Sequence, residues 1–370
     1  MLEIDAFYLR QFAKNAACAE KIGLTDDLAL LKELGLFTAC LPLHYGGKNF
    51  ARPHDDTTTQ IIFKILRQLG QVNLSLARLF EGHLNAIRLI DLYAAQSLRE
   101  KIFNEVSKGA LLGVWGADHI KKPLYFYHDT KNRIRLIGAK RFASGLGNID
   151  YALVTLRCTK NDPDQMSILN VQDQTRQKTE EWKVSGMRAT FSGVYDFSDL
   201  IIDPSHFIGK EGDLQLEPHF QGGIWRYCVA HLGGAESILQ EWQTLLKLRN
   251  RLNNPFQLSR LAQAYTLVLG LAAFLSKVAS LVEKASDNKT KKLIDDAVLA
   301  ALLARENTEN VCVNILNLCE KSLGMEAYQE HSALERMRRD LSLFIRQAAP
   351  DAKLLESANR LIERKGDLLW

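Results

Sequence analysis

The sequence predicts an α+β protein in which two helical regions flank a central β domain. Apolar residues recur every three or four positions up to residue 110 and again from residue 216, as they do along buried helix faces. Between residues 111 and 215 the pattern changes to short β-rich runs separated by clusters of Asp, Asn, Gly and Pro, which is typical of strands and turns. We therefore expect an N-terminal helical domain over residues 1–110, a β domain over 111–215 and a helical bundle over 216–370.

Regular leucine spacing marks the helices of the first region. One segment carries Leu28, Leu31 and Leu34 on a single face and is expected to end at Gly35. A longer helix further along has His83 within its apolar stripe. A histidine in that position is expected to be a core side chain with one hydrogen bond, or else a group that faces a functional cavity.

The β-rich runs of the middle region fit an antiparallel sheet or a small barrel. They are close together and have little helical pattern between them. No GxGxxG string follows a run and no P-loop occurs, so neither a Rossmann unit nor a P-loop nucleotide site is predicted. The runs lie at residues 111–115, 125–127, 134–137, 151–156 and 166–171.

Composition excludes several functional classes. Among the 370 residues, 47 Lys and Arg against 43 Asp and Glu leave a net charge of +4, too small to indicate nucleic-acid binding. The first residues contain acids and no apolar run, so we expect no secretory signal. The apolar stretch at 261–276 is shorter than the roughly 20 residues of a membrane span, so we expect a buried helix and no membrane insertion. Six dispersed cysteines without metal-ligand spacing favour a reduced, cytoplasmic protein and no metal site.

Five strings, in order along nearly the whole chain, resemble those of the acyl-CoA dehydrogenase family. The resemblance implies an N-terminal all-α domain, a middle β-barrel or sandwich and a C-terminal bundle, with FAD between the last two. It also implies a homodimer or homotetramer and oxidation of CH–CH bonds in an acyl thioester. The strings lie at residues 31–47 (LKELGL, then LP and YGG), 138–145 (GAKRFASG), 150–154 (DYALV), 186–199 (GMRAT, SG and FSD) and 324–340 (G, Y, ER and RD).

The resemblance assigns five residues to the cofactor. Phe142 and Ser144 match the aromatic and the hydroxyl beside the flavin ring, where an aromatic face can stack and a hydroxyl can donate. Arg251 and Gln263 match positions that bind the pyrophosphate and the adenosine, an end of FAD to which a dimer partner contributes. Gly324 is the remaining glycine of the family's GGxGY turn.

Two of these assignments have plainer alternatives. Ser144 could be a turn hydroxyl beside Gly145. Arg251 could be a solvated arginine at a helix end, and Arg249 competes with it for the pyrophosphate.

The chain departs from the family at the catalytic base. A dehydrogenase needs a carboxylate to remove the α-proton of the acyl group, and the position of the usual glutamate is Ala348. The family's other location for the base is Trp225, immediately before Arg226, which matches the helix arginine and is expected to bind substrate. Asp351 is the remaining candidate base.

Three functions therefore stay open. The main prediction is an FAD-dependent oxidoreductase that acts on an acyl-CoA or a carrier-bound acyl group and works with an electron-transfer or flavin-reductase partner. The first alternative is a flavin-dependent monooxygenase of the same fold, in which His83 and Ser144 would assist the reaction with oxygen. The second is a non-catalytic binding or scaffold protein, favoured by the missing base and the altered glycine turn.

Overall fold

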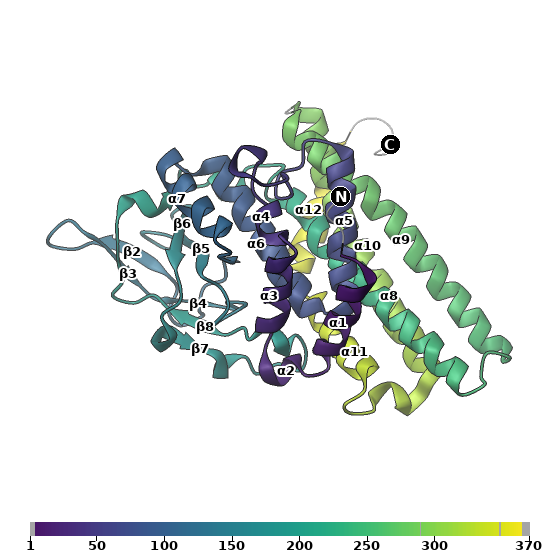
Figure 1. Cartoon of the computed structure of the whole chain (residues 1–370). Helices are drawn as coiled ribbons and strands as arrows, with labels where there is room; N and C mark the ends of the chain where they lie inside the picture. The colour runs from purple at the N-terminus through teal and green to yellow at the C-terminus, as the bar shows by residue number, and fades with distance from the viewer. Residues whose placement is uncertain (1–3, 289, 348, 365–370) are drawn as a thin grey trace.

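The computed structural model describes residues 4–288, 290–347 and 349–364, and helices, strands and helices follow one another along the chain (Figure 1). Asn73 ends one helix of the first region and caps the next, because its side chain accepts the backbone N–H of Ser75 at 3.0 Å. Gly35 adopts a left-handed conformation just after α3, where the sequence predicts an end. The helices are α1 (Ala6–Ala16), α2 (Ala19–Ile22), α3 (Thr25–Glu33), α4 (Leu36–Ala39), α5 (Asp56–Val72), α6 (Leu74–Tyr93) and α7 (Gln96–Ser107).

The middle region forms three small sheets. The strands run in the orders β1-β5-β6-β10, β2-β3-β9 and β4-β8-β7. They are β1 (Leu112–Trp115), β2 (Tyr125–His128), β3 (Ile134–Ile137), β4 (Ala139–Arg141), β5 (Tyr151–Leu156), β6 (Gln165–Asn170), β7 (Gln177–Lys178), β8 (Val194–Asp196), β9 (Ile201–Ile202) and β10 (Phe207–Ile208).

One strand pair differs from the antiparallel arrangement that the sequence predicts. β1 and β5 are parallel, with Leu112 opposite Tyr151, whereas the other pairs of named strands are antiparallel. The chain leaves β1, builds β2, β3 and β4, and returns to β5 by a crossover, which parallel neighbours require.

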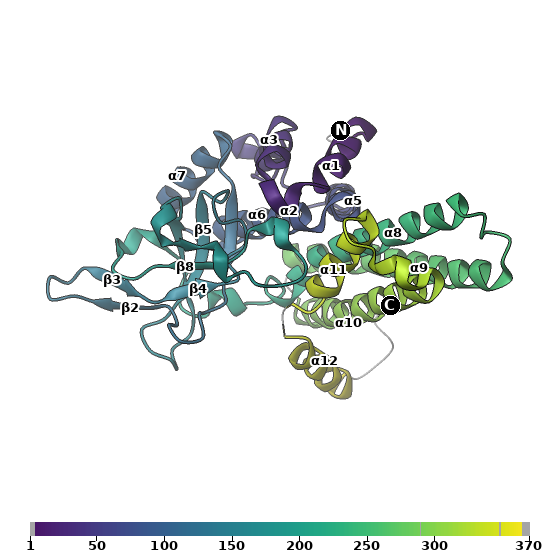
Figure 2. The same cartoon turned by 90° about the horizontal axis from the view of Figure 1, so that it is seen from below.

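The last region is a helical bundle around α8. Figures 1 and 2 show the strands at one end of the molecule and these helices at the other. The helices are α8 (Ile224–Leu248), α9 (Pro255–Asp287), α10 (Lys291–Leu323), α11 (Ala333–Phe344) and α12 (Pro350–Glu363). Short 3-10 helices complete the chain: η1 (Leu43–Tyr45), η2 (Gln174–Arg176), η3 (Thr179–Glu181), η4 (Arg188–Thr190), η5 (Pro204–His206), η6 (Asp213–Gln215), η7 (Gln221–Gly223) and η8 (Gly324–Tyr328).

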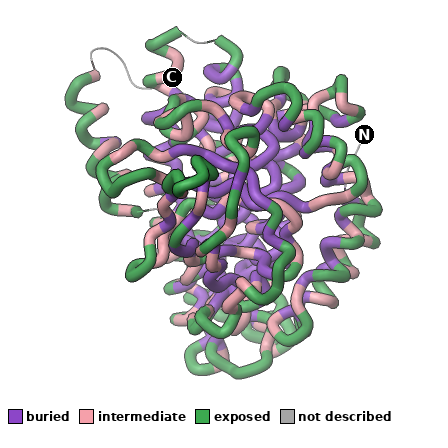
Figure 3. The backbone as a smooth tube through the Cα atoms, turned by 90° about the vertical axis from the view of Figure 1, so that its left-hand side faces the viewer, coloured by how far each residue is buried: buried purple, intermediate pink, exposed green. Residues whose placement is uncertain are grey.

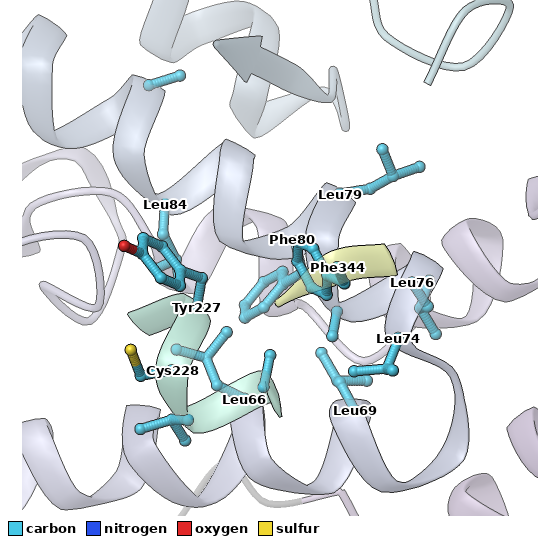
Figure 4. Packing of buried hydrophobic residues seen from close by; sticks show 14 of the residues in the cluster. Leu66, Leu69, Leu74, Leu76, Leu79, Phe80, Leu84, Tyr227, Cys228 and Phe344 are labelled. Carbon is cyan, nitrogen blue, oxygen red and sulfur yellow. The ribbon is translucent and has the colours of Figure 1, made fainter. Parts of the chain in front are cut away.

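The N-terminal helices and the bundle share one core. α8 packs on α5 and α6 as well as on α9, α10 and α11. Figure 4 shows the place where α5, α6, α8 and α11 meet. Leu66, Phe80, Cys228 and Phe344, one from each of these helices, belong to a single cluster of buried apolar side chains. Buried segments fill the interior and exposed ones surround it (Figure 3). The two helical regions are therefore held together by ordinary apolar packing.

Only one face of α9 is buried. Leu261, Val268 and Leu275 pack into the bundle, whereas Tyr265 and Leu269 on the other side are 40% and 64% exposed. The prediction of a buried helix at 261–276 is thus wrong for the outer side of α9, because this helix lies on the outside of the bundle. By length and composition alone, α9 is also the one helix of the described residues that could cross a membrane.

A tight joint connects the β domain to the bundle. The backbone N–H of Met187 donates to the buried carboxylate of Asp340 on α11. Gly186 passes so close to α11 that an added Cβ would lie 2.1 Å from the carbonyl oxygen of Arg339. Two strings far apart in the sequence, 186–187 and 339–340, therefore meet in the fold.

Replacing Gly186 with alanine is expected to lower the free energy of unfolding by about 1–3 kcal/mol, because the new methyl group overlaps rigid backbone. The measurement is urea denaturation followed by circular dichroism. Gly270→Ala is the control, since nothing lies within 4 Å of its Cβ position inside α9. The control should be neutral or gain up to about 1 kcal/mol. Equal stability of Gly186→Ala and wild type would contradict the close contact.

Candidate functional site

Two adjoining cavities lie where the three regions of the chain meet. Cavity A, of about 270 Å³, is formed by α6, the segment after β4, residues 182–192 and the end of α11. Cavity B, of about 450 Å³, is formed by α6, β1, residues 214–227 and the chain leading into α12. Arg78 and Gln347 line both cavities, so the two are neighbours.

Phe142 presents an exposed aromatic ring to cavity A. Its side chain is 52% exposed and its φ of 55° is left-handed, which is unusual for an aromatic residue. The conformation is fixed on its C-terminal side, where Ala143 N–H donates to the Gly193 carbonyl at 3.0 Å. Trp182 approaches the ring edge-on, with centroids 6.0 Å apart. These two rings give cavity A a surface suited to a flat aromatic ligand.

A row of hydroxyl groups continues from Phe142 along the same wall. Ser192 donates to the Ser144 hydroxyl at 3.3 Å, and Thr190 lies 2.7 Å from Ser192. Ser144 itself makes only a long bond, at 3.4 Å, to the Phe142 carbonyl. Its hydrogen can therefore turn toward a bound ligand at little cost. Thr190 and Ser192 are functional candidates that sequence reasoning missed, although both lie in the 186–199 string.

Two arginines that line cavity B, Arg88 and Arg226, belong to an ion network. Sequence reasoning missed this network apart from Arg226. Glu283 on α9 accepts from Arg88 of α6 at 2.7 Å, from Arg226 at 2.8 Å and from the indole N–H of Trp225 at 3.0 Å. Burial alone would raise the pKa of Glu283, but Arg88 and Arg226 lower it below its usual value, so this carboxylate stays charged. The available signal was a charged residue inside an apolar stripe, as Arg88 is beside Ile87 and Ile90.

A second carboxylate, Glu81, lines cavity B directly. Its side chain is buried, with 4% of the residue exposed, and it accepts hydrogen bonds from Arg78 at 2.6 Å and from the side-chain amide of Asn85. Both carboxylate oxygens of Glu81 therefore already have a hydrogen-bond partner within the protein.

The structure brings three of the sequence-predicted residues to these cavities. Phe142 and Ser144 line cavity A, and Arg226 lines cavity B, where it is 2% exposed. Burial lowers the pKa of Arg226 to about 10, with Arg88 contributing, so the side chain is a cation at neutral pH. Ala348, the position of the usual glutamate, lies outside the described residues.

Asp351 and His83 do not line either cavity. Asp351 is exposed in the first turn of α12. His83 is fully buried, with its Nε2 3.2 Å from the Phe37 carbonyl and its Nδ1 accepting the Leu112 N–H at 3.0 Å. It therefore has two backbone partners and ties α6 to α4 and β1.

The residues predicted to hold the adenosine end of FAD lie elsewhere in this chain. Arg251 is in the α8–α9 connection, which Figures 1 and 2 place at the opposite end from the strands. Glu326 forms an ion pair with Arg249 and lies 4.0 Å from Arg251. Gly324, with a left-handed φ of 62°, begins the short helix that carries Glu326. Gln263 donates only to Ser259, at 3.4 Å.

Comparison with solved structures shows the same architecture over nearly the whole chain. FMN-bound TdsC of Paenibacillus sp. A11-2, a dibenzothiophene monooxygenase, matches with a TM-score of 0.84 and 16% identity over 98% of this chain and 96% of its own. The methanesulfinate monooxygenase MsuC of Pseudomonas fluorescens matches with a TM-score of 0.83 and 16% identity, over 98% of this chain and 97% of its own. KijD3 in complex with FMN and a dTDP-sugar matches with a TM-score of 0.83 and 16% identity, over 98% of this chain and 94% of its own.

The chain has an acyl-CoA dehydrogenase-like fold. The fold class predicted from the sequence is confirmed, including the β domain between two helical regions. No family model matches the sequence. Within the described residues, no group of three or more His, Cys, Asp or Glu side chains could hold a metal ion.

The sequence relatives are monooxygenases. Dibenzothiophene monooxygenase of Mycolicibacterium goodii is 24% identical over 223 residues, 56% of this chain and 51% of that protein. The enzyme of Rhodococcus erythropolis is 26% identical over 212 residues, which are 54% of this chain and 47% of that protein. The chain thus spans about half the length of the relatives that it matches. These relatives favour the oxygenase alternative over the predicted CH–CH dehydrogenase, and the FMN in neighbouring structures differs from the predicted FAD.

The buried His83 should make stability depend on pH. Burial lowers its pKa from 6.5 to about 4, so the folded state favours the neutral ring. Between these values the unfolded chain binds more protons, so stability is present above pH 6.5 and is lost as pH falls toward 4. This pKa shift corresponds to about 3 kcal/mol in the free energy of unfolding.

The test is denaturant unfolding of wild type and His83→Gln at pH 7 and pH 4.5. The glutamine does not titrate, so the variant should lose about 2–3 kcal/mol less than wild type on acidification. Background contributions from other groups, including buried His231, cancel in this comparison. An identical pH dependence in both proteins would show that His83 is not held neutral by the fold.

Proposed function

We propose that this protein is a flavin-dependent monooxygenase that uses FMN and receives reduced flavin from a separate flavin reductase. The observation that carries the proposal is the pair of cavities. Cavity A offers an aromatic face and hydroxyl donors, and it adjoins cavity B, whose lining carboxylate Glu81 is held in an ion pair with Arg78. The monooxygenase relatives support the same assignment.

The residues of cavity A fit the ring system of a flavin. When bound in reduced form, FMN would supply the chemistry that activates O₂ and passes one oxygen atom to a substrate, while the other leaves as water. Phe142 and Trp182 cover a flat ring and exclude water from it. Ser144 can donate a hydrogen bond to the edge of the ring system, and Ser192 holds the Ser144 oxygen in place.

FMN is preferred to FAD because of the charges at the α8–α9 connection. A pyrophosphate needs unpaired positive charge, and the Glu326 carboxylate already neutralises Arg249 and lies near Arg251. The turn that contains Gly324 also carries Met325 and Glu326, side chains that would crowd a closely approaching cofactor. FMN lacks the adenosine half and so needs none of these groups.

Flavin titrations test the cofactor assignment. Phe142→Ala is expected to weaken FMN binding roughly 3- to 10-fold through loss of stacking, measured by flavin fluorescence. Arg251→Ala is the matched control and should leave FMN affinity unchanged. Tighter binding of FAD than of FMN, lost in Arg251→Ala, would restore the FAD assignment. A wild-type protein that binds neither flavin would overturn the proposed function. Transfer of one ¹⁸O atom from ¹⁸O₂ to an organic product, with FMN and a reductase present, tests the reaction itself.

We also propose that the protein is a homo-oligomer that buries the exposed face of α9. Leu258 and Leu269 lie on the same side of this helix and are 50% and 64% exposed, an apolar surface of the kind that protein interfaces cover. The resemblance to a dimeric or tetrameric family supports a homo-oligomer, without indicating which face is buried.

A charge placed on this face should dissociate the oligomer. Leu269→Glu is expected to shift the mass measured by light scattering toward the monomer without unfolding the chain, because the side chain is exposed. Ile137→Glu, at an exposed position of β3 that is 53% accessible, is the control and should keep the wild-type mass. A wild-type mass for Leu269→Glu would remove α9 as the interface.

A further inference from the structure

Cations outnumber carboxylates around cavity B. The side chains of Arg78, Arg88, Arg226 and Lys353 line it, and Glu81 is the carboxylate among the lining residues. Glu81 pairs with Arg78 at 2.6 Å. Of the other three cations, Arg88 and Arg226 share the Glu283 carboxylate behind them, and Lys353 lies near the carboxylates of Glu356 and Glu217.

One carboxylate cannot neutralise both arginines that it contacts. Glu283 lies 2.7 Å from Arg88 and 2.8 Å from Arg226, so this buried trio carries one positive charge in excess. Arg88 also donates to the Ala51 carbonyl at 3.1 Å and to the Ser286 hydroxyl at 2.6 Å, and its Nη2 lies 3.4 Å from Nδ1 of His219, another lining residue. Most donors of Arg88 are therefore used within the protein.

Arg226 keeps donors for a ligand. Its guanidinium has five N–H groups, of which one is given to Glu283 and one to Asn85 at 3.3 Å. The side chain is held rigidly by these two bonds and by burial, so it can bind a ligand without losing further side-chain freedom. A guanidinium of this kind recognises planar or tetrahedral oxyanions through paired hydrogen bonds.

The hydroxyl of Tyr227, the next residue on α8, points to the same kind of ligand. Tyr227 is 8% exposed and lines cavity B, yet its hydroxyl has no hydrogen-bond partner among the described residues. Figure 4 shows this hydroxyl on the side of the ring away from Phe80 and Phe344. Buried tyrosine hydroxyls are usually hydrogen-bonded, so the unpaired hydroxyl of a residue that lines the cavity is a donor without an acceptor among the described residues.

The remaining lining is largely apolar. Leu89, Val114, Leu214 and Ile224 supply aliphatic surface, and Lys353 lies 5.6 Å from the ring centroid of Phe220. A bare inorganic anion would leave this surface without a partner. An anionic group on an apolar body would contact both parts of the wall.

We propose that cavity B binds a small organic anion, an oxyacid group on an apolar body, with the acid group on Arg226 and Tyr227. This inference rests on the proposed function, because it names the substrate class of that oxygenase. The shared chemistry includes sulfonates, sulfinates and carboxylates.

The test is calorimetric titration of the full chain with 1-hexanesulfonate, hexanoate and the neutral 1-hexanol. We expect hexanesulfonate or hexanoate to bind at least about tenfold more tightly than hexanol, the effect of a charge-assisted hydrogen bond. Which acid binds better distinguishes a tetrahedral from a planar group. Hexanol that binds as tightly as both acids would overturn the proposal.

Tyr227→Phe is the main variant, because it removes only a hydroxyl that no described residue uses and should not affect folding. We expect this variant to bind hexanesulfonate or hexanoate about tenfold more weakly than the wild type does. Tyr265→Phe removes an exposed hydroxyl of α9 and is the control. Lys353→Gln tests the second cation without disturbing Glu283. Wild-type affinity in both Tyr227→Phe and Lys353→Gln would contradict the site.

FMN titrations of the same samples separate this inference from the proposed function. FMN binding without acid binding would overturn the anion site and leave the flavin assignment standing. Acid binding that depends on Tyr227, in a protein that binds neither flavin, would support the anion site and overturn the oxygenase.

Discussion

The charge of Glu283 holds two of the arginines that line cavity B. This single carboxylate joins Arg88 of α6 to Arg226 and Trp225 of α8, and Arg88 in turn reaches the backbone at Ala51. Without it two buried guanidinium groups would face each other uncompensated, a loss that costs several kcal/mol when one partner of a buried pair is removed. Helices α6, α8 and α9, the first two of which line the cavity, are thus held together by one ionised group as well as by apolar packing.

Cavity A depends on a contact of a different kind. Met187, which lines it, is fixed by the hydrogen bond from its backbone to Asp340, and Gly186 lets the two backbones approach. Burial raises the pKa of Asp340 to about 6, although the Met187 N–H and Arg336 lower it in part. The β domain therefore docks on the bundle through a carboxylate that is sensitive to mildly acidic conditions, close to the residues that face a ligand.

Much of the fold and part of the site could be predicted from the sequence. Helix periodicity and β-rich runs are local, so they identified several of the helices and, of the ten named strands, β1, β2, β3, β5 and β6. The family resemblance led to Phe142, Ser144 and Arg226. The ion network could not be predicted in this way. Arg88 and Glu283 are 195 residues apart, and no spacing relates residues whose contact arises only from helix packing. The parallel pair of β1 and β5 was missed for the same reason, because it depends on the path of the chain between them.

The backbone at Phe142 links the stability of the empty protein to its capacity for a ligand. A left-handed φ at a non-glycine residue costs of order 1–3 kcal/mol, and glycine or asparagine would relieve it. Either replacement would remove the ring that faces cavity A. The residue that best suits the backbone is therefore not the residue that best covers a flat ligand. Random mutagenesis selected for thermal tolerance alone would drive this position away from an aromatic side chain.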